Sequence, residues 1–164
     1  MNDKVIYGAT IASAAGSALS AGVFFAFSTL VMPSLNRISA AQAVPSMQSI
    51  NKLAPASLFG ATLFGTAITS AFLGITLITK WQQPGRSYLL AGVVLYLVGG
   101  ILVTAIFNVP KNDALAVLDP ADPNLTTKWN DYANAWTPWN HVRTVLTIAA
   151  SASFVLALRQ ANAD

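Results

Sequence analysis

The side chains most able to do chemistry are concentrated between Trp129 and Arg143. This segment holds three of the four tryptophans and the only histidine of the chain. An imidazole changes its charge near neutral pH, so His141 could act as a general base. Arg143 carries a permanent charge that could stabilise an enolate or another oxyanion. We therefore expect the function of the protein to depend on this segment.

Each of these side chains also has a purely structural interpretation. His141 could be an interfacial histidine bonded to a backbone carbonyl. Arg143 could extend to the membrane surface or pair with Asp113 or Asp131. Trp129 fits an aromatic belt at the membrane–water boundary. The residue types alone leave both interpretations open.

A helix start divides the segment in two. Thr137 is a good N-cap and proline is favoured at the first helical position, so the sequence predicts a helix that begins at Pro138. Asn140, His141 and Arg143 then lie around the first turn of that helix. Before the proline, aromatic and small residues recur at helical spacing, which predicts a short amphipathic helix. These residues are Trp129, Tyr132, Ala133 and Trp136.

The composition indicates a membrane protein. Of the 164 residues, 54% are hydrophobic and only 9% are charged, whereas soluble domains carry about 25% charged residues. The chain has no cysteine, so it has no disulfide and no thiolate ligand. Its net charge of +3 is scattered and forms no basic stripe, which argues against binding of nucleic acid.

Four apolar segments are long enough to cross a bilayer, which needs about 20 residues. They are residues 5–32, 55–79, 88–109 and 138–158. Short connections between them predict an all-α, up-down-up-down four-helix bundle, with both termini on the same side of the membrane. Short interfacial helices are expected in the connection between the first and second spans and in that between the third and fourth. The whole chain, 1–164, is then a single transmembrane domain.

The orientation of this bundle is weakly determined. The Lys and Arg counts on the two sides nearly tie, and we favour cytoplasmic termini in a bacterial inner membrane. The first span is expected to be retained, because its most apolar part follows the possible signal-peptide cleavage site. Small residues recur every four positions on this span and predict close packing of another helix, with a homo-oligomer as one possibility. They are Gly8, Ala12, Gly16 and Ser20.

Polar residues from two spans should meet at one membrane face. In an antiparallel arrangement, Asn108 and Asn112 at the end of the third span approach the polar start of the fourth. Buried amides need partners, since an unsatisfied polar group in apolar surroundings costs a few kcal/mol. Asn108 could tie the two helices together or donate a hydrogen bond to a ligand oxygen, and the two roles are compatible. We expect catalytic roles for His141, Arg143 and Asn108, and substrate-binding roles for Asn112, Trp136, Trp139 and Asn140.

Several kinds of site are excluded by what the sequence lacks. One histidine, no cysteine and no acidic residue within a span exclude a bis-histidine haem in one chain and a di-iron carboxylate site. No glycine-rich dinucleotide or phosphate loop is present. The spans also lack the charge chains of a proton-driven transporter. An enzyme built on this sequence should need neither a protein-bound metal nor a nucleotide.

Two motifs resemble a known family. They are Asn108-Val-Pro110-x-Asn112-Asp113 after the third span and Trp136-x-x-Trp139-Asn140-His141-x-Arg143 at the start of the fourth. With Phe24 to Leu35 in the first span, which includes Met32-Pro33, they are similar to the anthrone oxygenase-like membrane proteins (DUF1772). The similarity extends over nearly the whole chain, with the four-span layout intact.

The resemblance implies a cofactor-independent membrane oxygenase, a monooxygenase that oxidises an anthrone-like polyketide or another planar phenolic compound with O2. An anthrone C–H is acidic because its carbanion is a delocalised phenolate, and that anion can pass an electron directly to O2. His141 would be the base, with Arg143 and the asparagines as oxyanion donors and Trp136 and Trp139 as walls of an aromatic slot. The expected partners are a hydrophobic aromatic small molecule, O2 and membrane lipid. Two other readings remain: a non-catalytic binder of a lipid or quinone, and an assembly subunit.

Overall fold

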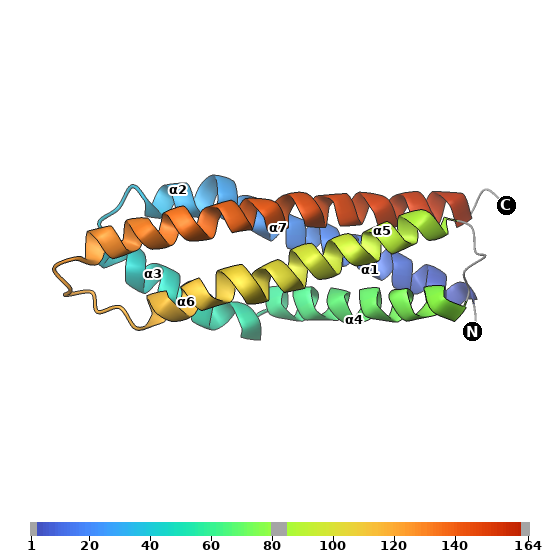
Figure 1. The fold of residues 1–164 in the computed structure, drawn as a ribbon, viewed down its shortest axis with the longest axis horizontal. Helices are drawn as coiled ribbons and strands as arrows, with labels where there is room; N and C mark the ends of the chain where they lie inside the picture. Colours follow the sequence, from blue (N-terminus) through green and yellow to red (C-terminus); the bar gives the residue numbers. More distant parts are fainter. Residues whose placement is uncertain (1–2, 80–84, 162–164) are drawn as a thin grey trace.

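The computed structural model describes residues 3–79 and 85–161, and the described chain is helical almost throughout, without a strand (Figure 1). Four helical segments are long and apolar enough to cross a membrane. They are Asp3–Leu35, Leu58–Ile78, Arg86–Ala116 and Leu125–Ala161. The predictions of an all-α fold and of a multi-pass integral membrane protein are therefore confirmed.

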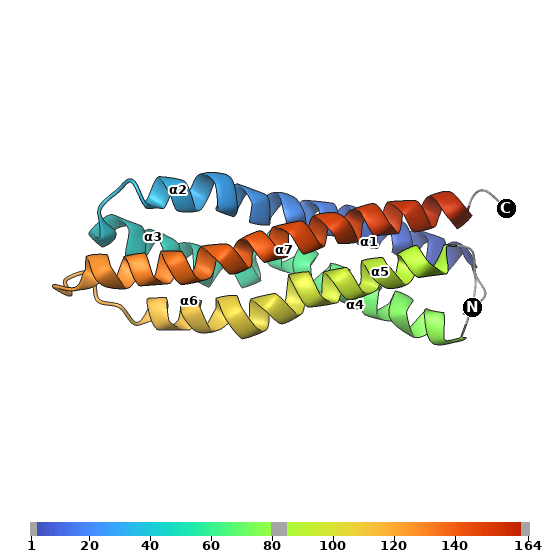
Figure 2. The ribbon, with the colours of Figure 1, turned by 45° about the horizontal axis from the view of Figure 1, so that its top comes forward.

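The long helices form an antiparallel bundle in which each helix packs against its neighbours in sequence. Its members are α1 (Asp3–Ala26), α4 (Leu58–Thr79), α5 (Arg86–Tyr96) and α7 (Leu125–Ala161). α1 contacts both α4 and α7, and α5 contacts the same two helices, so the four form a closed ring in the predicted up-down-up-down order. Figures 1 and 2 show α1 beginning and α7 ending at the same end of the bundle.

Two of the spans contain π-helical turns. α1 continues through η1 (Phe27–Val31) into α2 (Met32–Leu35). α5 continues through η3 (Leu97–Leu102) and η4 (Thr104–Asn108) into α6 (Val109–Ala116). π-helical turns are rare and occur frequently at functional sites. Both α2 and α6 lie at the end of the bundle opposite the start of α1 (Figure 1).

The fourth span differs from its prediction, because α7 is one helix of 37 residues that does not begin at Pro138. The proline lies inside the helix with its ring exposed. Buried residues recur at helical spacing on both sides of it, from Trp129 and Trp136 to Asn140 and Arg143. This continuous buried face outweighs the loss of one backbone hydrogen bond at the proline. The predicted amphipathic helix is the first part of α7.

The connection between the first two spans contains the predicted short helix. α3 (Ala40–Leu53) begins with a capping box formed by Ser39 and Gln42, and the 3₁₀ turn η2 (Ala54–Ala56) follows it. Gln48 Nε2 donates hydrogen bonds to the carbonyl oxygens of Leu115 (2.9 Å) and Leu118 (3.1 Å). These bonds tie α3 to the chain that leaves α6.

The connection between the third and fourth spans contains the short helix α6, which continues directly from η4, and the turn that leads into α7. This turn includes Asp122, which accepts hydrogen bonds from the Asn124 backbone N–H (2.7 Å) and from Lys128 Nζ. The bond from Lys128 holds the pKa of the Asp122 carboxyl below its usual range.

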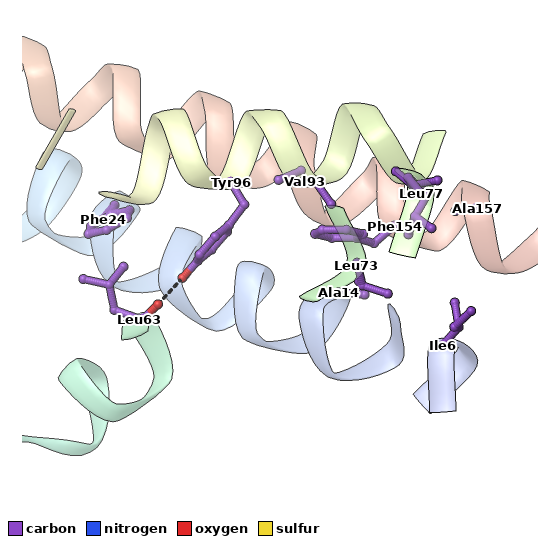
Figure 3. Packing of buried hydrophobic residues seen from close by; sticks show 12 residues of the cluster. Ile6, Ala14, Phe24, Leu63, Leu73, Leu77, Val93, Tyr96, Phe154 and Ala157 are labelled. Carbon is purple, nitrogen blue, oxygen red and sulfur yellow. Dashed lines mark hydrogen bonds between the residues drawn. The ribbon is translucent and has the colours of Figure 1, made fainter. Parts of the chain in front are cut away.

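The centre of the bundle is a mixed apolar and hydroxyl core. Figure 3 shows Tyr96 reaching across it, where its hydroxyl donates a 3.0 Å hydrogen bond to the Leu63 carbonyl. Ser20 Oγ lies 3.2 Å from the same hydroxyl. A Cβ atom at Gly16 would lie 1.9 Å from Thr66 Oγ1, so glycine permits the close approach of α1 and α4. Gly8 is exposed, so only part of the predicted small-residue stripe faces another helix.

Candidate functional site

A cavity of about 350 Å³ lies where α3 and η2 meet the four spans. This volume falls in the range of small-molecule sites, which is roughly 300–1,000 Å³. Most of the lining is apolar: Val23, Phe24, Phe27, Ile50, Leu53, Ala54, Pro55, Phe59, Gly60, Leu63, Phe64 and Val109. The rest is Asn51, Ser57, Thr104, Asn112, Trp136, Asn140 and Arg143. Two of these residues, Phe27 and Thr104, lie in the π-helical turns η1 and η4.

Arg143 is the only ionisable side chain among the described residues that line this cavity. It is 6% exposed, and no carboxylate in the described part of the chain pairs with it. Its guanidinium carbon lies 3.8 Å from the centroid of the Phe24 ring and 5.9 Å from that of Trp136. A cation inside a membrane bundle usually pairs with another group or marks a functional site. Here its neighbours are aromatic faces.

Buried polar atoms without a hydrogen-bond partner gather at this cavity. Four of its lining residues carry one: Asn51 Nδ2, Trp136 Nε1, Asn140 Oδ1 and Arg143 Nε. Three of these atoms are donors and one is an acceptor. Native proteins leave few such atoms unsatisfied, and each calls for an explanation. An acceptor atom of a bound ligand is one way to satisfy the donors among them.

Asn140 is held in place by hydrogen bonds between α7 and α1. Its Nδ2 donates to the Phe24 carbonyl oxygen (2.7 Å) and to Ser28 Oγ (2.8 Å), which lies in η1. Because the Phe24 carbonyl can only accept, the orientation of the amide is fixed and Oδ1 is the atom left without a partner. This arrangement joins the helix that carries Arg143 to the helix that carries Phe24.

The Trp136 ring is surrounded by aromatic side chains. Its centroid lies 5.9 Å from that of Phe27 and 6.3 Å from that of Tyr132. Asn108, at the end of η4, donates a 3.3 Å hydrogen bond from Nδ2 to the Trp136 carbonyl oxygen. Asn108 is fully buried and does not line the cavity. It therefore ties the third span to the fourth directly behind Trp136.

Asn112 lines the cavity, and its side chain is half-buried. Its Oδ1 accepts a 3.0 Å hydrogen bond from the Tyr132 hydroxyl. Since α6 carries Asn112 and α7 carries Tyr132, this bond fixes the spacing of the two helices at the cavity wall.

Four of the seven residues predicted for the site meet at the cavity: Asn112, Trp136, Asn140 and Arg143. His141 and Trp139 do not line it. His141 is exposed, because it follows Asn140 by one residue and is turned about 100° away from it around α7. Trp139 stacks on Phe107, with ring centroids 3.5 Å apart and an angle of 8° between the planes.

Two further residues of the site were not identified from the sequence as members of it. Phe24 lies under the guanidinium of Arg143, and Asn51 enters the cavity from the end of α3. Phe24 is the first residue of the first-span stretch that contributes to the family resemblance, so the resemblance could have indicated a role for Phe24. Asn51 stands in a polar connection with no motif around it, and its place in the cavity lining depends on how α3 packs against the spans.

The described residues offer no cluster of three or more His, Asp or Glu side chains that could hold a metal ion. The chemistry at hand is an apolar slot with one fixed cation, two free N–H donors and one free carbonyl acceptor. Such a site can bind a flat aromatic molecule and stabilise negative charge on one of its oxygens.

The family model described as anthrone oxygenase matches residues 55–153. The match begins at η2 and extends into α7, so it includes all the cavity residues from α4, η4, α6 and α7. Neither a curated protein nor a solved structure gives a significant match to the chain.

Proposed function

The chain belongs to the anthrone oxygenase family, and we propose that it is a membrane-embedded oxygenase that oxidises a planar phenolic, anthrone-like substrate with O2. The substrate lies in the cavity with its oxygen beside Arg143. Trp136 and Phe24 contact its aromatic body. Asn140 and Asn112 set the positions of the helices that form the walls.

One observation carries this proposal: the buried guanidinium of Arg143 has no anionic partner in the described part of the chain. Burying a charge is costly by several kcal/mol even after relaxation. The cation contacts with Phe24 and Trp136 return about 0.5–2 kcal/mol each. A ligand oxygen that is or becomes negative would supply the missing partner.

The proposed reaction uses only the substrate and O2. Loss of a proton from the CH2 group of an anthrone gives an anion whose charge lies largely on the ring oxygen. Arg143 stabilises that oxyanion and so favours the loss of the proton. The anion adds O2 at the former CH2 carbon to form a hydroperoxide, which loses water to leave a carbonyl. Overall, one anthrone and one O2 give one anthraquinone and one water. The four electrons that the CH2 carbon loses reduce the O2.

Arg143 is already protonated and cannot accept the proton from the substrate. The peroxide anion formed with O2 takes up a proton again to become the hydroperoxide, so the overall reaction releases no proton. His141, assigned as the base from the sequence, is exposed and lies outside the cavity lining. A role in catalysis for His141 stays a prediction, and the reaction as proposed does not depend on it.

The test is consumption of O2 by detergent-purified, metal-stripped protein supplied with a simple anthrone, measured above the spontaneous rate. Arg143→Gln should lower kcat/KM by about 10²–10³, the usual effect of removing one group that stabilises an oxyanion. Arg159→Gln is the matched control, because Arg159 is exposed in the last turn of the same helix. It should retain the wild-type rate.

Two outcomes would overturn the enzymatic proposal. If O2 consumption equals the background rate while a hydroxyanthraquinone still binds in an Arg143-dependent manner, the protein is a binder. If consumption is catalysed but is unchanged in Arg143→Gln, the reaction takes place elsewhere in the molecule.

A further inference from the structure

The exposed residues of the cavity lining are all apolar, whereas the buried ones include polar side chains. Four lining residues are exposed: Leu53, Pro55, Phe64 and Val109. All four are apolar, and the exposed fractions of the three larger side chains are 66% for Leu53, 54% for Phe64 and 40% for Val109. We call these four residues the mouth of the cavity. The polar lining residues are all half-buried or buried.

The buried part of the lining includes polar side chains. Trp136, Asn140 and Arg143 are among the buried residues, and they carry three of the unpartnered polar atoms. Polarity therefore increases from the mouth toward the interior. A site that takes its ligand from water usually has the reverse order, with polar groups where solvent enters.

The mouth lies between elements that separate at this end of the bundle. α4 packs against α5 and η3, but it makes few or no contacts with η4 and α6. Phe64 is on α4 and Val109 is on α6, while Leu53 and Pro55 stand at the corner where α3 turns into α4. Phe64 and Val109 both belong to segments able to span a membrane. An opening between two such segments can face the bilayer directly.

From these observations we propose that the cavity opens sideways into the hydrocarbon region and that its ligand, a hydrophobic aromatic molecule dissolved in the bilayer, reaches Arg143 through the Leu53–Pro55–Phe64–Val109 mouth. An apolar opening of this kind would be a liability in water but has no such cost against lipid tails. The ligand thus passes from the lipid into an apolar slot and contacts the Arg143 guanidinium only at the inner end of the cavity. The nature of the ligand rests on the proposed function, whereas the route by which it enters the cavity does not.

The first arm of the test measures which phase the mouth faces. The chain has no cysteine, so single cysteines can carry a nitroxide spin label without background. Phe64→Cys and Val109→Cys in liposomes should collide more with O2, which concentrates in lipid, than with a charged nickel chelate in water. Ile68→Cys, exposed on α4 outside the cavity, is the lipid-facing control, and Ala121→Cys, in the turn before α7, is the aqueous control.

The second arm measures the route itself under argon, so that no turnover occurs. A dihydroxyanthraquinone is added to proteoliposomes and its binding is followed by quenching of tryptophan fluorescence. Val109→Trp should slow association by about tenfold, which corresponds to about 1.4 kcal/mol of added barrier. It should slow dissociation as well, whereas damage to the cavity itself would speed dissociation. Ile68→Trp should change neither rate.

Labels at the mouth that behave like Ala121→Cys would overturn the proposal, since the opening would then face water. Unchanged rates in Val109→Trp would overturn it as well, because the ligand would have another path. If the wild type binds no anthraquinone, the proposed function fails, and the spin labels still decide whether the mouth faces lipid.

Discussion

The guanidinium carbon of Arg143 lies 3.8 Å from the centroid of the Phe24 ring. The two residues stand on α7 and α1, which pack side by side along the bundle (Figure 2). A contact of this type is worth about 0.5–2 kcal/mol, less than the several kcal/mol needed to bury an unpaired charge. The ring orients the cation without fully compensating its burial. The deficit is a driving force for binding an oxyanion.

Removing the charge should make the protein more stable. Arg143→Met keeps an unbranched side chain over Phe24 and removes a buried cation without an anionic partner. We expect a gain of about 1–3 kcal/mol in the free energy of unfolding, with activity lost. Reversible unfolding in mixed detergent micelles would measure it. Arg159→Met, at an exposed position, should be neutral. A clear loss of stability in Arg143→Met would mean that the aromatic contacts outweigh desolvation.

Two tryptophans should respond in opposite ways when the indole N–H is removed. Trp129 Nε1 donates a 3.0 Å hydrogen bond to Asn36 Oδ1, whereas Trp136 Nε1 has no partner among the described residues. Trp136→Phe should weaken binding of an anionic hydroxyanthraquinone by about 10–100-fold, the worth of a hydrogen bond to a charged group. Trp129→Phe should leave that Kd unchanged.

Stability should show the reverse pattern. Both substitutions shrink a buried ring, but only Trp129→Phe also breaks a hydrogen bond, so it should cost about 1 kcal/mol more. Titration of each variant with the hydroxyanthraquinone measures its affinity, and unfolding of each variant measures its stability. Equal ligand affinity in the two variants would remove Trp136 Nε1 from the site.

Asn140 should be a structural contact as well as a cavity residue. Asn140→Ala removes both hydrogen bonds that this side chain donates, to the Phe24 carbonyl and to Ser28 Oγ, and should destabilise the bundle by about 1–3 kcal/mol. Ser28→Ala removes only one of the two acceptors and should cost less, about 0.5–1.5 kcal/mol. Unfolding of both variants in mixed micelles measures the difference. Equal losses would show that the Ser28 hydroxyl, and not the Phe24 carbonyl, is the partner that matters.

His141→Ala separates two accounts of the reaction. The exposed position of His141 outside the cavity lining leads us to expect a kcat for O2 consumption close to that of the wild type. A general base in the rate-limiting step would instead lower kcat by about 10²–10⁴-fold when removed. The assay is the one used for Arg143→Gln. A loss of that size would place the reacting carbon near His141 and require a substrate position outside the cavity described above.

The spans could be predicted from the sequence because the length of an apolar run is a local property. Charge depletion and four long apolar segments identify a four-helix membrane bundle before any packing is known. The start of the fourth span could not be predicted in this way. The rule for a proline after a threonine describes an isolated helix end, whereas α7 continues through Pro138 because its buried face is continuous on both sides.

The site shows the same division. The sequence alone shows that a cation, an asparagine and tryptophans stand within one short stretch, and Trp136, Asn140 and Arg143 were predicted from it as site residues. Which of these neighbours face inward depends on how the helices pack. A step of one residue turns a helix by about 100°, so Asn140 points into the bundle and His141 points out. Tertiary packing also brought Phe24 to Arg143 and Asn51 to the same cavity, because contacts between residues far apart in the chain depend on how whole helices pack and not on local spacing.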